Sequence, residues 1–407
     1  MKKVLSVILG LIVIILCGVF VLRNSQKDNN EVVFWTLQMS DFSDYMNGVI
    51  SDFEKENPDI KIKWIDVPFS EGEKRTLASV MSDNPPDLIN LNPDFSATLA
   101  QKGTLYEIPE SNAEQYNQAI VNSLKYNGKL YSLPWYATSA VTIYNRELIH
   151  KAGVKIPQTY EETAEIAPLM KSETGAYVFL PNITENDTML KILNKYGINS
   201  PDTINSEKSV YVFEMFKSLY SKNLIPKESI TQTHREALEK YMSENIVLFQ
   251  AGANFLNMIK ENAPSTYAHT DVAPQITGTL GQNDFSLMNF VIPERAKHKT
   301  EAIKFALYLT NDKNQLELAK LTNVIAVNKK TLNNEFYTKY SDNDLMAKAR
   351  VISAKQLNKV EPTLRTSRNQ KDINNLINTA VQNILLGKGK TEEILNKLSK
   401  DWAELVK

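Results

Sequence analysis

The side chains in this sequence that suit ligand contact are aromatic rings and amides, and the usual signatures of catalysis are missing. The sequence has no G-x-S-x-G serine elbow, no H-E-x-x-H zinc motif and no glycine-rich phosphate loop. Carboxylates are plentiful, so a glycosidase-type pair stays open, although no pattern singles out two of them. We therefore expect a binding site without catalytic residues.

Two aromatic segments are the first candidates for ligand contact. Trp35 and Gln38 stand at the end of a predicted strand, and Trp135 and Tyr136 follow a predicted hairpin. Aromatic rings beside amides suit a sugar, which has C–H faces and hydroxyl edges. Trp35 is more typical of a core position. Pro134 favours an irregular loop at Trp135, so we expect that indole to stack on a ligand.

Three polar residues are further candidates, each beside or inside a predicted strand. Asp94 follows the strand 87–91, Asn254 ends a strand-to-helix turn, and Asn289 lies in the strand 285–292. Open α/β sheets bind ligands outside the carboxyl ends of their strands, which favours a ligand role for Asp94. An alternative is equally open, in which Asp94 is the N-cap of a helix over 95–102.

The elements that must position these residues alternate between strand and helix. Buried or alternating strands are predicted at 31–36, 60–64 and 87–91, separated by segments with helical spacing. The pattern recurs with strands at 140–144, 246–249 and 285–292, and only helical patterns follow residue 344. This alternation is typical of an α/β fold with a mainly parallel sheet. Two lobes woven from several chain segments fit it better than two successive domains.

The N-terminus predicts export and attachment to a membrane. Lys2 and Lys3 precede an apolar run from Val4 to Leu22, as in an export signal. Two outcomes stay open: Cys17 ends a lipobox-like segment and would be lipidated, or the run spans the bilayer as an uncleaved helix. Either outcome places the bulk of the protein on the extracytoplasmic face of the cell membrane.

Composition excludes several functions. Forty-six Lys and Arg against 47 Asp and Glu leave a net charge of −1 in 407 residues, without the excess of cations that nucleic-acid binding requires. One cysteine and four scattered histidines provide neither a disulfide framework nor a metal-ligand pair at helical spacing. We expect no metal and no cofactor.

Ten segments between about Glu31 and Trp402 resemble, in the same order, those of one protein family. This family comprises the maltose-binding-protein-like extracellular solute-binding proteins of carbohydrate ABC importers. These segments are Val33–Thr36, Phe53–Pro58, Pro86–Leu91, Lys102–Leu105, Leu130–Tyr136, Ile143–Leu148, Lys151–Gly153, Pro157–Tyr160, Glu301–Leu309 and Asn323–Asn328. The resemblance implies two lobes joined by hinge strands, with a sugar held between them and delivered to the permease subunits of an importer.

The resemblance also implies roles for particular residues. Trp35, Gln38 and Asp94 would face the ligand from the N-terminal lobe, and Trp135 and Tyr136 would lie at the first hinge. Asn254, Asn289 and Arg365 align with further ligand positions. Asn254 stands where relatives often carry an aromatic ring, and this departure argues against stacking there.

The resemblance divides the chain into lobes as follows. Residues 1–30 form the signal or anchor and a spacer, 31–138 and 272–312 the N-terminal lobe, and 139–271 and 313–407 the C-terminal lobe. We expect a monomer. Two rival functions stay open, an extracytoplasmic enzyme acting on glycosides and a ligand-sensing partner of a signalling receptor.

Overall fold

The structure is a computed structural model that describes residues 30–179, 182–357 and 369–406. These residues form two compact units that interleave along the sequence. Unit 1 comprises the described residues up to Leu91 with Thr104–Tyr106 and Val291–Leu309. Unit 2 comprises Asn92–Gly103, Glu107–Phe290 and the described residues from Thr310 onward. The lobe boundaries expected from the sequence differ from these limits and stay a prediction, and Cys17 and Arg365 lie outside the described residues.

Unit 1 is built on a parallel sheet, as the sequence predicts. Its strands run in the order β3 (Leu88–Leu91), β1 (Asn30–Leu37), β2 (Ile60–Val67), and β1 is parallel to both neighbours. Parallel neighbours need crossover connections, which helices α2 (Ser43–Glu56) and α3 (Phe69–Val80) supply after the short helix η1 (Ser40–Phe42). Helix α13 (Lys299–Leu309) packs against β1 and β3 from the second half of the sequence.

Aromatic rings from distant segments form the core of unit 1. Phe34 of β1, Phe53 of α2 and Phe305 of α13 have no exposed surface. The Phe305 ring lies edge-on to Phe34 at 5.3 Å and to Phe53 at 4.9 Å between ring centroids. Edge-to-face contacts of this kind add to the stabilisation from apolar burial, so they join the N-terminal strands to a helix more than 200 residues later.

Unit 2 contains most of the helices and two main groups of paired strands, besides a two-stranded hairpin. Three strands run in the order β12 (Ile325–Ala326), β6 (Ser132–Thr138), β11 (Ser286–Val291), and four run in the order β10 (Thr270–Ala273), β7 (Ala140–Asn145), β9 (Ile246–Gly252), β8 (Tyr177–Phe179). Its helices are η2 (Glu110–Ala113), α4 (Pro93–Gln101), α5 (Gln118–Ser123), α6 (Arg146–Lys151), α7 (Tyr160–Thr174), α8 (Thr188–Asn194), α9 (Glu207–Ser221), η3 (Lys227–Ile230), α10 (His234–Met242), α11 (Phe255–Asn262), α12 (Pro264–Ala268), α14 (Asp312–Thr322), η4 (Thr331–Asn333), α15 (Glu335–Thr338), α16 (Leu345–Gln356), α17 (Gln370–Leu385) and α18 (Thr391–Leu405).

The four-stranded sheet corrects the expectation of mainly parallel strands. β7 is antiparallel to both β9 and β10, and only β8 and β9 are parallel. β7 follows β6 directly through Ser139, so no crossover helix sets its direction, whereas helices α8, α9, η3 and α10 lie between β8 and the parallel β9. The fold is α/β with mixed sheets.

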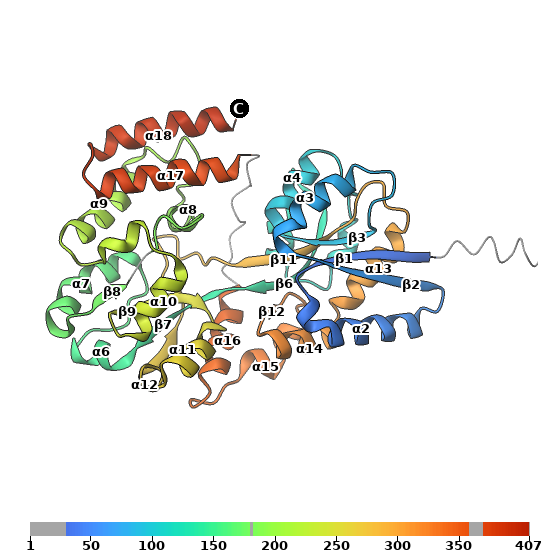
Figure 1. Cartoon of the computed structure of the whole chain (residues 1–407), viewed down its shortest axis with the longest axis horizontal. Helices are drawn as coiled ribbons and strands as arrows, with labels where there is room; N and C mark the ends of the chain where they lie inside the picture. The colour runs from blue at the N-terminus through green and yellow to red at the C-terminus, as the bar shows by residue number, and fades with distance from the viewer. Residues whose placement is uncertain (1–29, 180–181, 358–368, 407) are drawn as a thin grey trace, which may run out of the picture. The chain divides into compact units, whose positions relative to one another are not determined.

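Two predictions from the sequence are confirmed in unit 2, the hairpin and the helical C-terminal region. Asn127 and Gly128 have φ values of 49° and 77°, as a two-residue turn of type I′ requires, and they join β4 (Lys125–Tyr126) to β5 (Lys129–Leu130). Helices α17 and α18 lie side by side (Figure 1), and their apolar faces share a core with α9. The helical C-terminal region therefore belongs to the core of unit 2.

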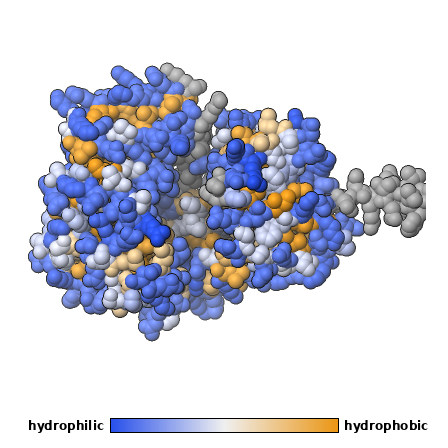
Figure 2. Space-filling view, viewed as in Figure 1, coloured by the Kyte–Doolittle hydropathy of each residue, from blue (hydrophilic) through white to orange (hydrophobic). Residues whose placement is uncertain are grey.

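Hydrophilic residues cover most of the face shown in Figure 2. The large apolar side chains of β1, β6, β7 and β9 are mostly buried. Within the described ranges, no helix is long and apolar enough to cross a membrane.

Gly278 is a point where the backbone allows no side chain. A Cβ atom there would lie 2.7 Å from the main-chain oxygen of Lys195 and 2.9 Å from the Tyr196 ring. We predict that Gly278→Ala lowers the free energy of unfolding by about 1–3 kcal/mol, because backbone atoms cannot yield to an overpacked group.

The matched control is Gly48→Ala in α2, where a Cβ meets no atom within 4 Å. This change should raise stability by about 0.5–1 kcal/mol, the cost of glycine in a helix. Urea denaturation of both variants checks the pair, and equal stabilities would contradict the close approach at Gly278.

Candidate ligand-binding site

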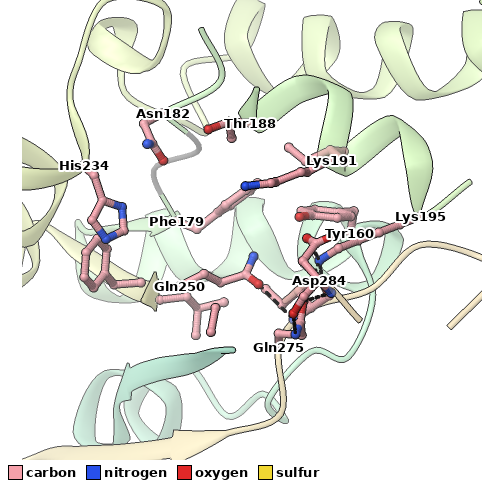
Figure 3. A pocket seen from close by; sticks show the side chains of 15 residues that line it. Tyr160, Phe179, Asn182, Thr188, Lys191, Lys195, His234, Gln250, Gln275 and Asp284 are labelled. Carbon is pink, nitrogen blue, oxygen red and sulfur yellow. Dashed lines mark hydrogen bonds and ion pairs between the residues drawn. The ribbon is translucent and has the colours of Figure 1, made fainter. Parts of the chain in front are cut away.

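A cavity of about 170 Å³ lies within unit 2 (Figure 3). Its walls come from the start of α7, the loop and helix around α8, the start of α10, strand β9 and the connection from β10 to β11. A cavity of about 150 Å³ holds a benzene molecule, so this space can accept a group the size of one six-membered ring.

One wall of the cavity is built around a buried ammonium group. The Lys195 side chain is 3% exposed, and its Nζ lies 3.0 Å from a carboxylate oxygen of Asp284. The same Nζ donates to Gln275 Oε1 at 3.0 Å and to the main-chain oxygen of Ile276 at 2.8 Å. Because an ammonium has three N–H donors, these contacts satisfy all of them. Lys195 therefore organises the wall and has no donor left for a ligand.

Burial and charge set the protonation of this wall. Burial raises the pKa of Tyr160, so its hydroxyl stays protonated at neutral pH. Burial acts to lower the pKa of Lys195, but interactions with Tyr160 and Asp284 outweigh it and raise that pKa above its ordinary value. Lys195 is thus a cation whose charge Asp284 compensates.

The hydrogen bonds extend from this wall to the chain connection between β6 and β7. Gln275 Nε2 donates to Ser139 Oγ at 3.2 Å, and Gln356 Nε2 donates to the same oxygen at 2.9 Å. The main-chain N–H of Gln275 donates to Gln356 Oε1 at 2.7 Å. All three side chains are buried. The connection from β10 to β11 is therefore fixed from both sides before any ligand binds.

The opposite wall offers polar groups to a ligand. Asn182, Thr188, Lys191 and His234 surround the open part of the cavity, and Gln250 faces them from β9 (Figure 3). The ring of His234 lies 4.7 Å from that of Phe249, centroid to centroid. Burial lowers the pKa of His234, with Glu185 opposing, so the imidazole is neutral at pH 7 and offers one donor and one acceptor.

This arrangement can hold a polyhydroxylated ring. Phe179, Phe249 and Leu248 supply apolar surface, and the amides, hydroxyl and imidazole supply both donors and acceptors. Among the described residues that line the cavity, Asp284 is the only carboxylate. A glycosidase needs two flanking carboxyl groups, so the described lining favours binding over bond cleavage.

Trp135 is not the ligand platform that the sequence predicts. The segment around Pro134 is strand β6, and Trp135 has no exposed surface. Its indole stacks on Phe290 with 4.8 Å between centroids. The strand runs from Ser132 to Thr138, and it pairs with β12 at Tyr136 and Ala137, past Pro134. The proline therefore does not break the strand, and Trp135 is a core residue.

Of two other predicted contacts, Asn289 is fully buried and Tyr136 is half-buried. Asn289 has no exposed surface, and its Nδ2 donates to Ser96 Oγ at 2.8 Å, which is a structural role between β11 and α4. Tyr136 is half-buried, and burial raises its pKa to about 12, so it keeps its phenolic proton.

Trp35, Gln38 and Asp94 keep accessible surface. Trp35 is half-buried in β1, and Gln38 follows the strand with a φ of 54° and an exposed side chain. Asp94 is exposed in the first turn of α4, whose N-cap is Asn92, which accepts from Phe95 N at 2.7 Å. The expected alternative of Asp94 as the N-cap is wrong, because the helix begins one residue earlier than Asp94, at Pro93.

Asn254 lies outside the first cavity and lines a second one of about 260 Å³, also within unit 2. None of the predicted ligand residues that the structure describes lines the first cavity. Sequence reasoning missed Lys195, His234 and Asp284, which have no motif. Tyr160 ends one of the segments that resemble the family, Pro157–Tyr160, and Gln250 directly follows the predicted strand 246–249.

Comparisons with known proteins agree with a binding function. The profile of bacterial extracellular solute-binding proteins matches residues 48–345. The multiple sugar-binding protein of Streptococcus mutans is 25% identical over 329 residues, which is 74% of this chain and 77% of that protein. The galactooligosaccharide-binding protein of Bacillus subtilis is 23% identical over 309 residues, 71% of each chain.

A solved structure shows the fold. The sugar-binding protein MalE from Xanthomonas citri superposes with a TM-score of 0.80 at 19% identity, covering 92% of this chain and 97% of that one. This chain therefore shares the α/β fold of the two-lobed periplasmic-binding proteins. It belongs to the bacterial extracellular solute-binding proteins, and this family and these relatives are binding proteins and not enzymes.

The position of Trp135 generates a prediction about stability. Trp135→Ala should lower the free energy of unfolding by about 3–5 kcal/mol, as expected for a large aromatic side chain removed from a core. Trp135→Phe, which keeps a ring against Phe290, should lose less. Thermal melts of both variants without ligand check this. A normal melting temperature together with lost ligand affinity would show that Trp135 contacts the ligand.

Proposed function

Because the chain is an extracellular solute-binding protein, we propose that it captures a sugar or oligosaccharide outside the cytoplasm and delivers it to an ABC importer. The observation that carries the proposal is the cavity of Figure 3, which combines apolar rings with hydrogen-bond donors and acceptors. The names of two relatives, a multiple sugar-binding protein and a galactooligosaccharide-binding protein, support the same ligand class.

In this proposal the two walls of the cavity have different roles. The wall built on Lys195 is saturated with internal hydrogen bonds and provides shape. The wall with Asn182, Thr188 and Lys191 forms hydrogen bonds to ligand hydroxyls, and His234 adds its ring nitrogens. Such a division keeps the binding groups few and directional, which is how small-molecule sites select their ligands.

Of the residues that the sequence proposed for ligand contact, Gln38, Asp94 and Asn254 stay candidates because their side chains are exposed. Ligand binding would favour one conformation of the protein, and the importer would recognise that conformation. No covalent chemistry is needed for this cycle.

We propose further that the protein is tethered to the outer face of the cell membrane. The apolar run from Val4 to Leu22 and the preceding lysines support an anchor, either a lipid on Cys17 or an uncleaved helix. The tether would keep the binding protein close to the importer and raise its effective concentration there.

Binding without chemistry is the first test. A panel of mono- and oligosaccharides should contain a ligand that raises the melting temperature of the purified protein in proportion to ln(1 + [L]/Kd). His234→Phe keeps the ring beside Phe249 but loses both nitrogens. This variant should bind that ligand with an affinity about 2- to 10-fold lower, because one net hydrogen bond contributes about 0.5–1.5 kcal/mol.

The matched control is His150→Phe at an exposed position of α6, which should bind like the parent protein. Chromatography of the ligand after incubation with an equal amount of protein should recover it unchanged. A hydrolysed or transferred product would overturn the binding-only function.

The tether has its own prediction. Metabolic labelling with a fatty acid should label the membrane-bound protein, and Cys17→Ser should abolish the label if the lipobox operates. A protein that stays in the membrane without label identifies the helix as the anchor. A full-length protein found free of the membrane would contradict tethering.

A further inference from the structure

The second cavity of unit 2 contains a cation whose charge the described part of the protein does not pair. Arg350 lines this space of about 260 Å³ together with Asn254, Ser139, Ser353 and Thr138. Its Nε donates to the main-chain oxygen of Phe336 at 2.8 Å, and its guanidinium carbon lies 3.6 Å above the centre of the Phe336 ring. These contacts hold the guanidinium in one place, half-buried at the cavity.

The two terminal nitrogens of Arg350 have no partner among the described residues. The hydrogen bond through Nε leaves four N–H donors in a planar fork, and neither a salt bridge nor another hydrogen bond engages them. The acidic residue nearest along the chain is Asp344, whose carboxylate caps α16 by accepting from Ala347 N at 2.9 Å. Burial acts to lower the pKa of Arg350, and Asp344 acts against it. A partly desolvated cation with free donors favours an anion supplied from outside.

Asn254 adds a neutral donor beside this cation. It precedes α11, and its side chain forms no capping hydrogen bond to that helix. Its Oδ1 lies against Gly252, where an added Cβ would come within 2.6 Å of it. The absence of a side chain at Gly252 thus lets the amide lie over the backbone of the β9–α11 turn. Because the amide forms no capping hydrogen bond, it is available to a ligand in the cavity.

The geometry points to a second ligand site, in which Arg350 and Asn254 bind an oxyanion such as a carboxylate or a phosphate. A guanidinium fork matches two oxygens of a carboxylate or phosphate in parallel hydrogen bonds. The amide Nδ2 of Asn254 and the hydroxyl of Thr138, which is exposed at the same cavity, can donate to the remaining oxygens. This site goes beyond the proposed capture of a sugar and does not rest on it.

Two sources could supply such an anion, an acidic sugar or a free inorganic anion. Inorganic phosphate, glucuronate and glucose, each at constant ionic strength made up with chloride, distinguish them in thermal-shift and calorimetric titrations of the full chain. Stabilisation by glucuronate and not by phosphate or glucose identifies an acidic sugar. Stabilisation by phosphate identifies a free anion. Either result supports the site.

Three variants locate the binding. Arg350→Gln should lower the affinity for the anion at least 10-fold. Arg350→Lys should recover part of this affinity, because lysine keeps the positive charge but lacks the two parallel N–H donors of the guanidinium. Asn254→Ala, at an exposed position, should weaken binding several-fold while leaving the melting temperature without anion unchanged. Arg295→Gln, which removes an exposed arginine paired with Asp83, is the matched control and should bind like the parent protein.

Either of two results would overturn the inference. It fails if neither anion stabilises the parent protein beyond chloride, or if Arg350→Gln and Asn254→Ala bind the anion as well as the parent. Neutral sugar binding is measured in Arg350→Gln, which changes no residue proposed for sugar contact, so a failure of this site is distinct from a failure of sugar capture.

Discussion

The buried ammonium of Lys195 is the interaction on which the candidate site depends. A charge removed from water is tolerated only where oxygens surround it, and here they come from Asp284, Gln275 and the main chain of Ile276. These three residues belong to one connection, between β10 and β11. Satisfying the charge therefore also fixes the path of that connection and, with it, one wall of the cavity.

Fixing this wall in advance has a consequence for binding. The same connection is joined through Gln275 and Gln356 to Ser139, where β6 passes into β7. Side chains that are already ordered lose little conformational entropy when a ligand arrives, and that entropy is a major cost of association. The cavity thus meets its ligand with one rigid wall, and adaptation is left to the longer side chains opposite, such as Lys191.

The sequence predicted the elements better than the site. Strands such as 31–36 and 87–91 are recognisable from runs of apolar residues or from the alternation of apolar and polar residues. These local patterns depend little on which elements pack beside the strand. Trp135 was misjudged because a proline is tolerated in a strand according to which strands pair beside it, and the sequence does not show that β6 lies between β12 and β11. Lys195 carried no signal, since lysine is ordinarily exposed and its burial follows from partners 80 and more residues away.

Two of the cations in unit 2, Lys195 and Arg350, show why charge alone does not mark a ligand group. Lys195 and Arg350 both line cavities, but the donors of Lys195 are consumed within the protein, whereas Arg350 uses Nε and leaves its fork open. The guanidinium can do both because its five donors point in fixed, separate directions, so one edge anchors it while the other faces outward. An ammonium surrounded by three acceptors has no such second edge. In this protein the lysine is therefore suited to hold a wall, and the arginine to hold a ligand.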